Sequence, residues 1–389
     1  MRNLYFGDRG TLVKYVQLAL WRAGFSLAVD GIFGSRTCQA LQKFLGDSKE
    51  CSVNQQAWRR LIPYLKGYRE EEGRKIPLDY PMVPENVEYS SILTEYIVEG
   101  LVLRYPFLET GSIGNSVMGS PISYLRIGQG AIQVFYNASF HANENITTPI
   151  LLRFAEEYAR AYATRDVFFG AAATELFEKY SLYLVPMVNP DGVDLVNGIL
   201  QNGSFYRQAQ KIAAQFPQIP FPSGWKANIE GVDLNLQFPA GWEKAKEIKY
   251  AQGYNRPAPR DFVGNAPLTA PESAAVARFT EEHDFSLILA YHTQGKVIYW
   301  KYQDYEPEGS YAIAQYFGEV SGYAVEETPS ESGNAGYKDW FIQEYNLPGY
   351  TIEAGEGENP LPMSQFGEIY QDNIGILMGG MTQLPVTGA

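Results

Sequence analysis

The sequence predicts an α/β fold preceded by a small helical unit, and two patterns support this. From about residue 78 onward, apolar runs typical of strands alternate with segments of helical periodicity. Such alternation favours a sheet that is covered by helices on both faces. Residues 1–66 instead contain three short helical patterns. At 389 residues, of which 45% are hydrophobic, the chain is long enough for two domains.

Residues 1–66 are expected to form a compact unit of three helices around one small core. Thr11, Ser35 and Asn54 each precede a run with apolar residues on one side. Each of the three side chains can accept a hydrogen bond from the first turn, so each is predicted to cap the helix that follows it.

A charged, glycine-containing stretch at residues 67–77 is predicted to link the two domains. The larger domain would then comprise residues 78–389. Its predicted strands are 131–137, 181–187, 285–291, 296–300 and 348–353. Its predicted helices are 147–163, 271–283, 309–321 and 363–378.

Charge and composition exclude several classes of function. The net charge is −13 and no stretch is rich in Lys or Arg, so binding to nucleic acid or an anionic membrane is not expected. No apolar run reaches the roughly 18 residues of a membrane span. The start shows no signal peptide, which favours a cytoplasmic or spore-associated protein. Cys38 and Cys51 are therefore expected to stay reduced.

Three side chains that suit a metal ion fall at the ends of predicted strands. His141 and Glu144, within His141-Ala142-Asn143-Glu144, follow one strand, and His292 ends another. Ligands collect at the carboxyl ends of strands in open α/β sheets. Two histidines and a glutamate form a catalytic zinc site with an open position. His283, at the polar end of a predicted helix, is expected to be structural.

Four further motifs follow in a fixed order along the larger domain. They are Asn189-Pro190-Asp191-Gly192, Asp233-Leu234-Asn235-Leu236, Asp339-Trp340 and Thr351-Ile352-Glu353. Together with the candidate metal ligands, this ordered set resembles the zinc carboxypeptidase family over roughly residues 90–380. The resemblance implies a mixed, largely parallel sheet flanked by helices, which periodicity alone does not give.

The resemblance also implies the central chemistry. His141, Glu144 and His292 would hold one zinc ion per chain. Glu353 would act as general base toward metal-activated water. The protein would then be a zinc metallopeptidase.

Three more residues receive roles from the same resemblance. Asp233 would accept a hydrogen bond from His141 and fix its tautomer, and Lys226 would stabilise the oxyanion. Asn235 would bind polar groups of the substrate. From the residues alone, Asp233 could also be a turn residue, Lys226 a solvated lysine and Asn235 a brace within its loop.

Two departures from the family pattern bear on the substrate. Leu236 stands where the family has an arginine that grips the terminal carboxylate, and the family's mobile tyrosine has no clear equivalent. The runs 231–239 and 335–340 resemble the bacterial branch that cleaves between γ-D-glutamyl and a diamino acid in peptidoglycan stem peptides. Tyr337 and Lys338 fall where the family builds its specificity pocket, so they could meet the extra carboxylate of meso-diaminopimelate.

The N-terminal unit points to the same substrate. Its sequence from Gly7 to Phe44 resembles that of the widespread peptidoglycan-binding module. The leading interpretation is therefore zinc-dependent hydrolysis of the γ-D-glutamyl–diamino acid bond, with peptidoglycan or muropeptides as partners. One alternative is a true metallocarboxypeptidase that removes C-terminal residues. Another is a non-catalytic peptidoglycan-binding protein.

Overall fold

A computed structural model describes residues 1–47, 49–67 and 80–384. Apart from Gly67, the predicted linker at 67–77 and the first residues of the predicted larger domain lie outside the described residues. The division into two domains therefore stays a prediction. Among the described residues, every helix is too short or too polar to span a lipid bilayer.

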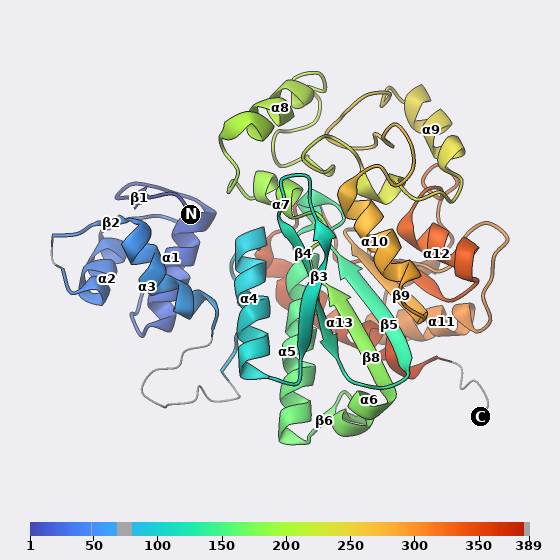
Figure 1. Ribbon diagram of the computed structural model, residues 1–389, viewed down its shortest axis with the longest axis horizontal. Helices are drawn as coiled ribbons and strands as arrows, with labels where there is room; N and C mark the ends of the chain where they lie inside the picture. The colour runs from blue at the N-terminus through green and yellow to red at the C-terminus, as the bar shows by residue number, and fades with distance from the viewer. Residues whose placement is uncertain (48, 68–79, 385–389) are drawn as a thin grey trace.

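An eight-stranded mixed sheet forms the centre of the larger part (Figure 1), in the order β11-β10-β12-β9-β5-β8-β4-β3. Four neighbouring pairs are parallel: β10–β11, β12–β9, β9–β5 and β5–β8. The sheet confirms the expected fold class. The strands are β3 (Glu109–Asn115), β4 (Pro121–Ile127), β5 (Ile132–Ala138), β8 (Tyr180–Val185), β9 (Phe285–His292), β10 (Val297–Tyr299), β11 (Ala324–Glu326) and β12 (Gly349–Glu353).

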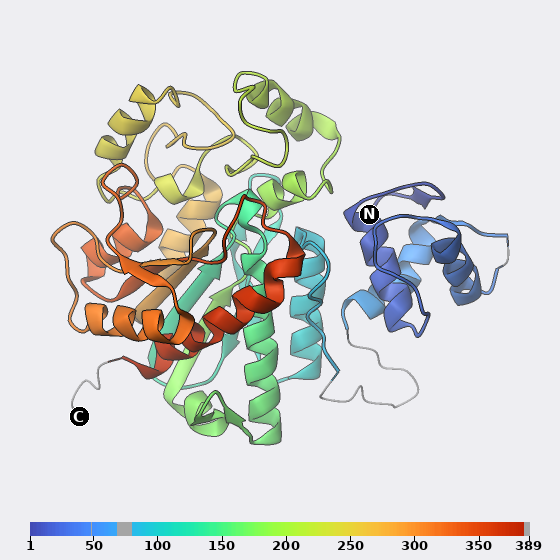
Figure 2. The same ribbon diagram turned by 180° about the vertical axis from the view of Figure 1, so that it is seen from behind.

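Helices cover both faces of this sheet (Figures 1 and 2), because each central strand is apolar on both sides. In β9, Leu289 and Tyr291 pack into the core on the side of α5 and α13, while Ile288 and Ala290 face α10 and α12. The main helices of this part are α4 (Ser91–Arg104), α5 (Thr147–Thr164), α6 (Ala173–Lys179), α7 (Pro190–Val196), α8 (Gly203–Ala213), α9 (Trp242–Ala251), α10 (Pro271–Glu281), α11 (Ser310–Ser321), α12 (Tyr337–Tyr345) and α13 (Phe366–Thr382).

Every strand and helix predicted for this part is present, with ends displaced by a few residues at most. The outer strands β3 and β11, and β4 beside β3, were not predicted. Along β3 only Ile113 is a buried apolar residue, because the strand lies at the edge of the sheet and is otherwise largely exposed. Such a strand lacks the apolar alternation on which the prediction depends.

The N-terminal unit contains the three expected helices, α1 (Thr11–Arg22), α2 (Ser35–Leu45) and α3 (Gln55–Leu65). It is not purely helical, because β1 (Leu4–Tyr5) pairs antiparallel with β2 (Ser52–Val53). Two of the expected caps are also wrong. The N-cap residues of α1 and α2 are Gly10 and Gly34, and only Asn54 accepts the predicted hydrogen bond, from Ala57 N.

The two cysteines form a disulfide, which corrects the expectation that they stay reduced. Cys38 lies in α2 and Cys51 precedes β2, and their Cα atoms are 5.2 Å apart. The chain turns back after α2 to pair β2 with β1, and this return brings the second cysteine to the first. The expectation of reduced cysteines rested on the lack of a recognisable signal peptide. That feature does not indicate whether the fold brings two thiols within bonding distance.

Polar contacts fix the N-terminal unit against the segment that precedes α4. Lys14 Nζ lies 2.6 Å from a carboxylate oxygen of Glu88, and Tyr15 Oη donates to Glu88 O at 2.8 Å. Tyr15 Oη also accepts a hydrogen bond of 3.0 Å from Ser90 N. The N-terminal unit lies beside α4 in both views (Figures 1 and 2). Its core joins the core under α4 in one continuous cluster of buried residues.

Tyr15→Phe should lower the free energy of unfolding by about 1–3 kcal/mol, because it leaves the buried Ser90 N–H without its acceptor. Denaturant titration of the whole chain measures this loss. Tyr5→Phe is the matched control, since Tyr5 is 56% exposed and should change stability little. Equal stability of the two variants would contradict the role given to Tyr15.

Candidate metal centre

Three neighbouring strands bring two candidate metal ligands and the candidate general base to one edge of the sheet. The ligand His141 follows β5 and the ligand His292 ends β9, while Glu353, the candidate base, ends β12. The strands are parallel neighbours, and Glu353 is the register partner of His292. Their carboxyl ends therefore meet at one place, where α/β sheets commonly bind ligands.

His141, Glu144 and His292 converge around one point. His141 Nδ1 lies 2.9 Å from one carboxylate oxygen of Glu144, and His292 Nδ1 lies 2.9 Å from the other. The two Nδ1 atoms are 3.2 Å apart. All three side chains are buried, and their ligand atoms lie within 4.8 Å of one another. The structure thus brings together the three ligands that the sequence suggested.

The donor set fits a zinc ion. Asp233 Oδ1 lies 3.1 Å from His141 Nε2, so Nε2 can donate to it while Nδ1 faces the centre. Burial opposes the charged ring, but Glu144 and Asp233 raise the pKa of His141 to about 9, and a cation at the centre would favour the neutral ring with a lone pair on Nδ1. Burial lowers the pKa of His292, which favours the neutral ring that a metal needs. Two imidazole nitrogens and a carboxylate then face one another in a buried space, an arrangement that a divalent cation satisfies.

Lys226 belongs to the same cluster. Its Nζ lies 3.0 Å from Glu144 Oε1, and its side chain is 17% exposed. Burial opposes the ionised form of Glu144, but His141 and Lys226 hold the pKa of Glu144 well below its ordinary value. Lys226 is therefore a largely buried, paired charge of the site and not a solvated surface lysine.

Glu353 is the second carboxylate of the centre. Burial, with a smaller contribution from the charge of Glu144, raises the pKa of Glu353 to about 8. A divalent cation held by the neighbouring ligands would lower this pKa by direct attraction. Glu353 would then be ionised at neutral pH, as a general base must be.

Tyr337 does not reach the site with its hydroxyl. The side chain is fully buried, and its Oη shares a hydrogen bond of 2.9 Å with Thr280 Oγ1 of α10. Its backbone N–H instead donates to Asn235 Oδ1 at 3.0 Å and fixes that amide at the cavity wall. Tyr337 begins α12 next to the cavity residue Asn235, but its hydroxyl is not available to a substrate.

Lys338 lines the cavity, and its ammonium is held by three neighbours. Its Nζ donates to Lys301 O at 2.7 Å and to Thr328 Oγ1 at 3.1 Å. It also forms an ion pair with Asp339 Oδ1 at 2.6 Å, an oxygen that accepts no hydrogen bond from the described residues. Contact of Lys338 with a substrate carboxylate stays a prediction.

Two cavities meet at the centre. One, of about 210 Å³, has Asn235 and Leu236 in its wall, and the other, of about 520 Å³, has Asn143 in its wall. Both are lined by Lys226, Arg260, Tyr299 and Glu353. The sequence did not single out Arg260 or Tyr299. Arg260 lies in a proline-rich loop with no periodicity, and nothing in a single sequence shows that this loop crosses the site.

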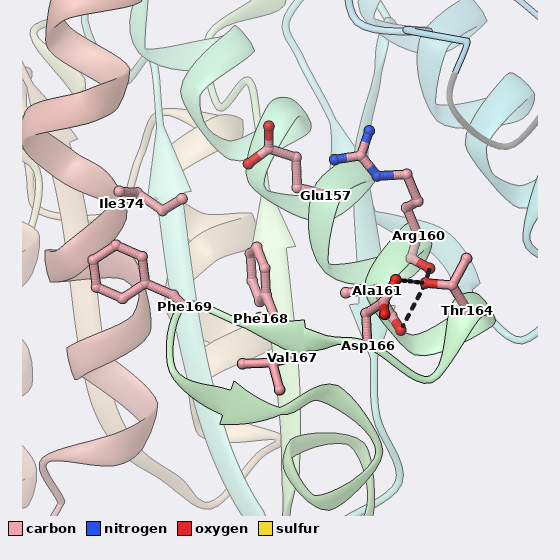
Figure 3. A pocket seen from close by; sticks show the side chains of 9 residues that line it. All are labelled: Glu157, Arg160, Ala161, Thr164, Asp166, Val167, Phe168, Phe169 and Ile374. Atoms are coloured by element: carbon pink, nitrogen blue, oxygen red, sulfur yellow. Dashed lines mark hydrogen bonds between the residues drawn. The ribbon is translucent and has the colours of Figure 1, made fainter.

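A third cavity, of about 620 Å³, is unrelated to the centre. It lies between the C-terminal half of α5 and the middle of α13, where Figure 3 shows the rings of Phe168 and Phe169 beside Ile374. Because α5 has 18 residues, its C-terminal end is about 27 Å from the end that leads to the metal ligands. None of the candidate site residues lines this cavity.

Comparison with known proteins assigns the family. Residues 94–375 match the family model described as zinc carboxypeptidase. The chain belongs to the zinc carboxypeptidase family. Members of this family are zinc metallopeptidases, so the protein is an enzyme of that class, and its buried His-Glu-His cluster suits the family's metal.

Two bacterial relatives are similar over most of their length. The chain is 45% identical over 298 residues to "Gamma-D-glutamyl-L-diamino acid endopeptidase 1" of Lysinibacillus sphaericus, which covers 76% of this chain and 72% of the relative. It is 42% identical over 309 residues to the uncharacterised protein YqgT of Bacillus subtilis, covering 79% and 80%.

Solved structures agree on the fold. Thrombin-activatable fibrinolysis inhibitor matches with a TM-score of 0.61 at 15% identity, covering 97% of this chain and 99% of that chain. Carboxypeptidase A from Helicoverpa armigera matches with a TM-score of 0.57 at 18% identity, covering 99% and 100%.

Asp233→Asn should weaken zinc binding by about 10- to 100-fold, because the neutral amide supports the His141 tautomer less well. Competition with a chromophoric chelator measures the change in zinc Kd. Asp284→Asn, a change at an exposed carboxylate, is the control. An unchanged Kd in correctly folded Asp233→Asn protein would exclude the orienting role.

Proposed function

We propose that the enzyme hydrolyses the bond between γ-D-glutamyl and a diamino acid, such as meso-diaminopimelate, in peptidoglycan stem peptides. The observation that carries this proposal is Leu236, which lines the smaller cavity beside Asn235. Leucine offers no donor to a terminal carboxylate, whereas a guanidinium would bind it through two parallel hydrogen bonds. The name of the relative that shares 45% identity supports the same substrate.

The site has room for several substrate residues. The cavities of about 210 Å³ and about 520 Å³ share Lys226, Arg260, Tyr299 and Glu353 among their lining residues. A substrate bound across this shared group would contact both cavities.

The proposed roles follow from the contacts. His141, Glu144 and His292 would hold zinc, which supplies the Lewis acidity that activates water and polarises the scissile carbonyl. Glu353 would take the proton from the attacking water and pass it to the leaving amine. Lys226, held at the site by Glu144, would place its positive charge near the oxygen on which negative charge develops.

The N-terminal unit is proposed to bind peptidoglycan and so bring the catalytic part to its substrate. The sequence resemblance from Gly7 to Phe44 supports this role. The polar contacts of Lys14 and Tyr15 with the segment before α4 would hold the two parts in a fixed relation during such binding.

Zinc-loaded enzyme should release L-alanyl-D-glutamate from L-alanyl-γ-D-glutamyl-meso-diaminopimelate and leave ordinary peptides with free C-termini intact. Mass spectrometry of the products separates the two activities. Loss of single residues from ordinary C-termini would establish the carboxypeptidase alternative. Zinc binding without cleavage of either substrate would favour a non-catalytic peptidoglycan-binding protein.

Glu353→Gln should lower kcat on the stem peptide by about 10²- to 10⁴-fold, because the amide cannot accept the proton of water. Its zinc content should stay at the wild-type value, since Glu353 is outside the predicted ligand set. Glu356→Gln, an exposed neighbour, is the matched control. Steady-state kinetics and metal analysis on the same preparations test both statements, and retained turnover would exclude Glu353 as the base.

A further inference from the structure

Among the described cations that line both cavities, Arg260 is the one whose role the proposed mechanism leaves open. It lines both cavities, and its side chain is 44% exposed. Its Nε donates to Asp261 Oδ2 at 2.6 Å. The two terminal nitrogens have no hydrogen-bond partner among the residues that the structure describes. The outer edge of the guanidinium is therefore open to a ligand.

Arg260 shares its carboxylate partner with another cation. Lys226 is paired with Glu144, and Lys338 is paired with Asp339. Arg260, in contrast, must share Asp261 with Lys249, whose Nζ lies 2.6 Å from Asp261 Oδ1. One carboxylate thus serves two cations, which leaves Arg260 without a carboxylate partner of its own at the junction of the two cavities.

The loop that carries Arg260 is fixed to the catalytic residues on both sides. Pro259 O accepts hydrogen bonds from Lys226 N at 2.8 Å and from Ala227 N at 2.9 Å. Asp261 N donates to Asp233 Oδ2 at 3.1 Å. Asp261 also has a φ of 65°, a left-handed backbone conformation that a residue other than glycine adopts only where its surroundings hold it. Arg260 is thus held at a defined place beside the site.

On these grounds, and resting on the function proposed above, we infer that Arg260 selects substrates by binding the free α-carboxylate of the γ-linked glutamyl residue. Ordinary peptide bonds within a chain leave no such carboxylate free. The carboxylate on the L-centre of a terminal diamino acid, in contrast, is the same terminal group that ordinary peptides carry. A guanidinium edge with two free nitrogens matches a carboxylate in a bidentate pair.

The test uses three peptides and the zinc-loaded full-length enzyme. The first is L-alanyl-γ-D-glutamyl-meso-diaminopimelate, the second has the glutamyl α-carboxylate replaced by a carboxamide, and the third has the L-centre carboxylate of the diamino acid replaced in the same way. The kcat/KM of each peptide is measured for wild-type enzyme, Arg260→Gln, Arg260→Lys and the control Arg256→Gln. Arg256 lies in the same loop but lines neither cavity, and it contacts Gln215.

Wild-type enzyme should cleave the all-carboxylate peptide about 10- to 100-fold faster than the peptide with the glutamyl carboxamide. An equal preference against the diamino acid carboxamide alone would contradict the inference. Arg260→Gln should lose the preference for the glutamyl carboxylate, Arg260→Lys should keep part of it, and Arg256→Gln should keep all of it. Because the preference is a ratio within one protein preparation, it does not depend on how much of the variant is folded.

Two further results would overturn the inference while leaving the proposed function intact. In one, wild-type enzyme cleaves all three peptides equally. In the other, Arg260→Gln slows all three by the same factor and keeps the preference. If wild-type enzyme cleaves none of them, the proposed function fails, and the inference that rests on it fails too.

Discussion

The parallel pairing of β9 with β5 on one side and β12 on the other is the constraint on which the whole site depends. His141 and His292 are 151 positions apart in sequence, yet their Nδ1 atoms lie 3.2 Å apart. Only the register of these strands brings them together. A shift by one residue would turn every side chain of a strand to the opposite face, and it would separate Glu353 from His292. The buried apolar faces of β9 therefore fix the geometry of the chemistry as well as the stability of the core.

Placing so many charges at one sheet edge is costly unless each charge has a partner. The protein meets this cost by pairing the charges with one another. Glu144 faces two imidazoles and Lys226, and Asp233 pairs with His141 while accepting the N–H of Asp261. These bonds are made before any substrate arrives, so under the proposed mechanism the charges would already be oriented for the transition state.

The sequence predicted the centre of this structure well and its periphery poorly. The strands that carry His141, His292 and Glu353 are buried on both faces, so their apolar runs stand out, and the ordered motifs identified the ligands that meet there. The edge strand β3 and the disulfide were missed, because neither leaves a periodic signal in one sequence. The specificity pocket was predicted in part. Position alone suggested Tyr337 and Lys338, but hydrogen bonds to Thr280, Lys301 and Thr328 decide where those two donors point.

The loop with Arg260 shows why a site of this kind resists prediction. It has no helical or strand period, yet its backbone holds Lys226 through Pro259 O and Asp233 through Asp261 N. Residues that set substrate preference and residues that orient the catalytic groups therefore share one short segment. A side chain in this loop can change only if the main chain keeps those bonds, and the side chain of Arg260 makes none of them. Substrate preference can then vary at this position while the metal centre stays intact, which is how one fold serves peptidases with different substrates.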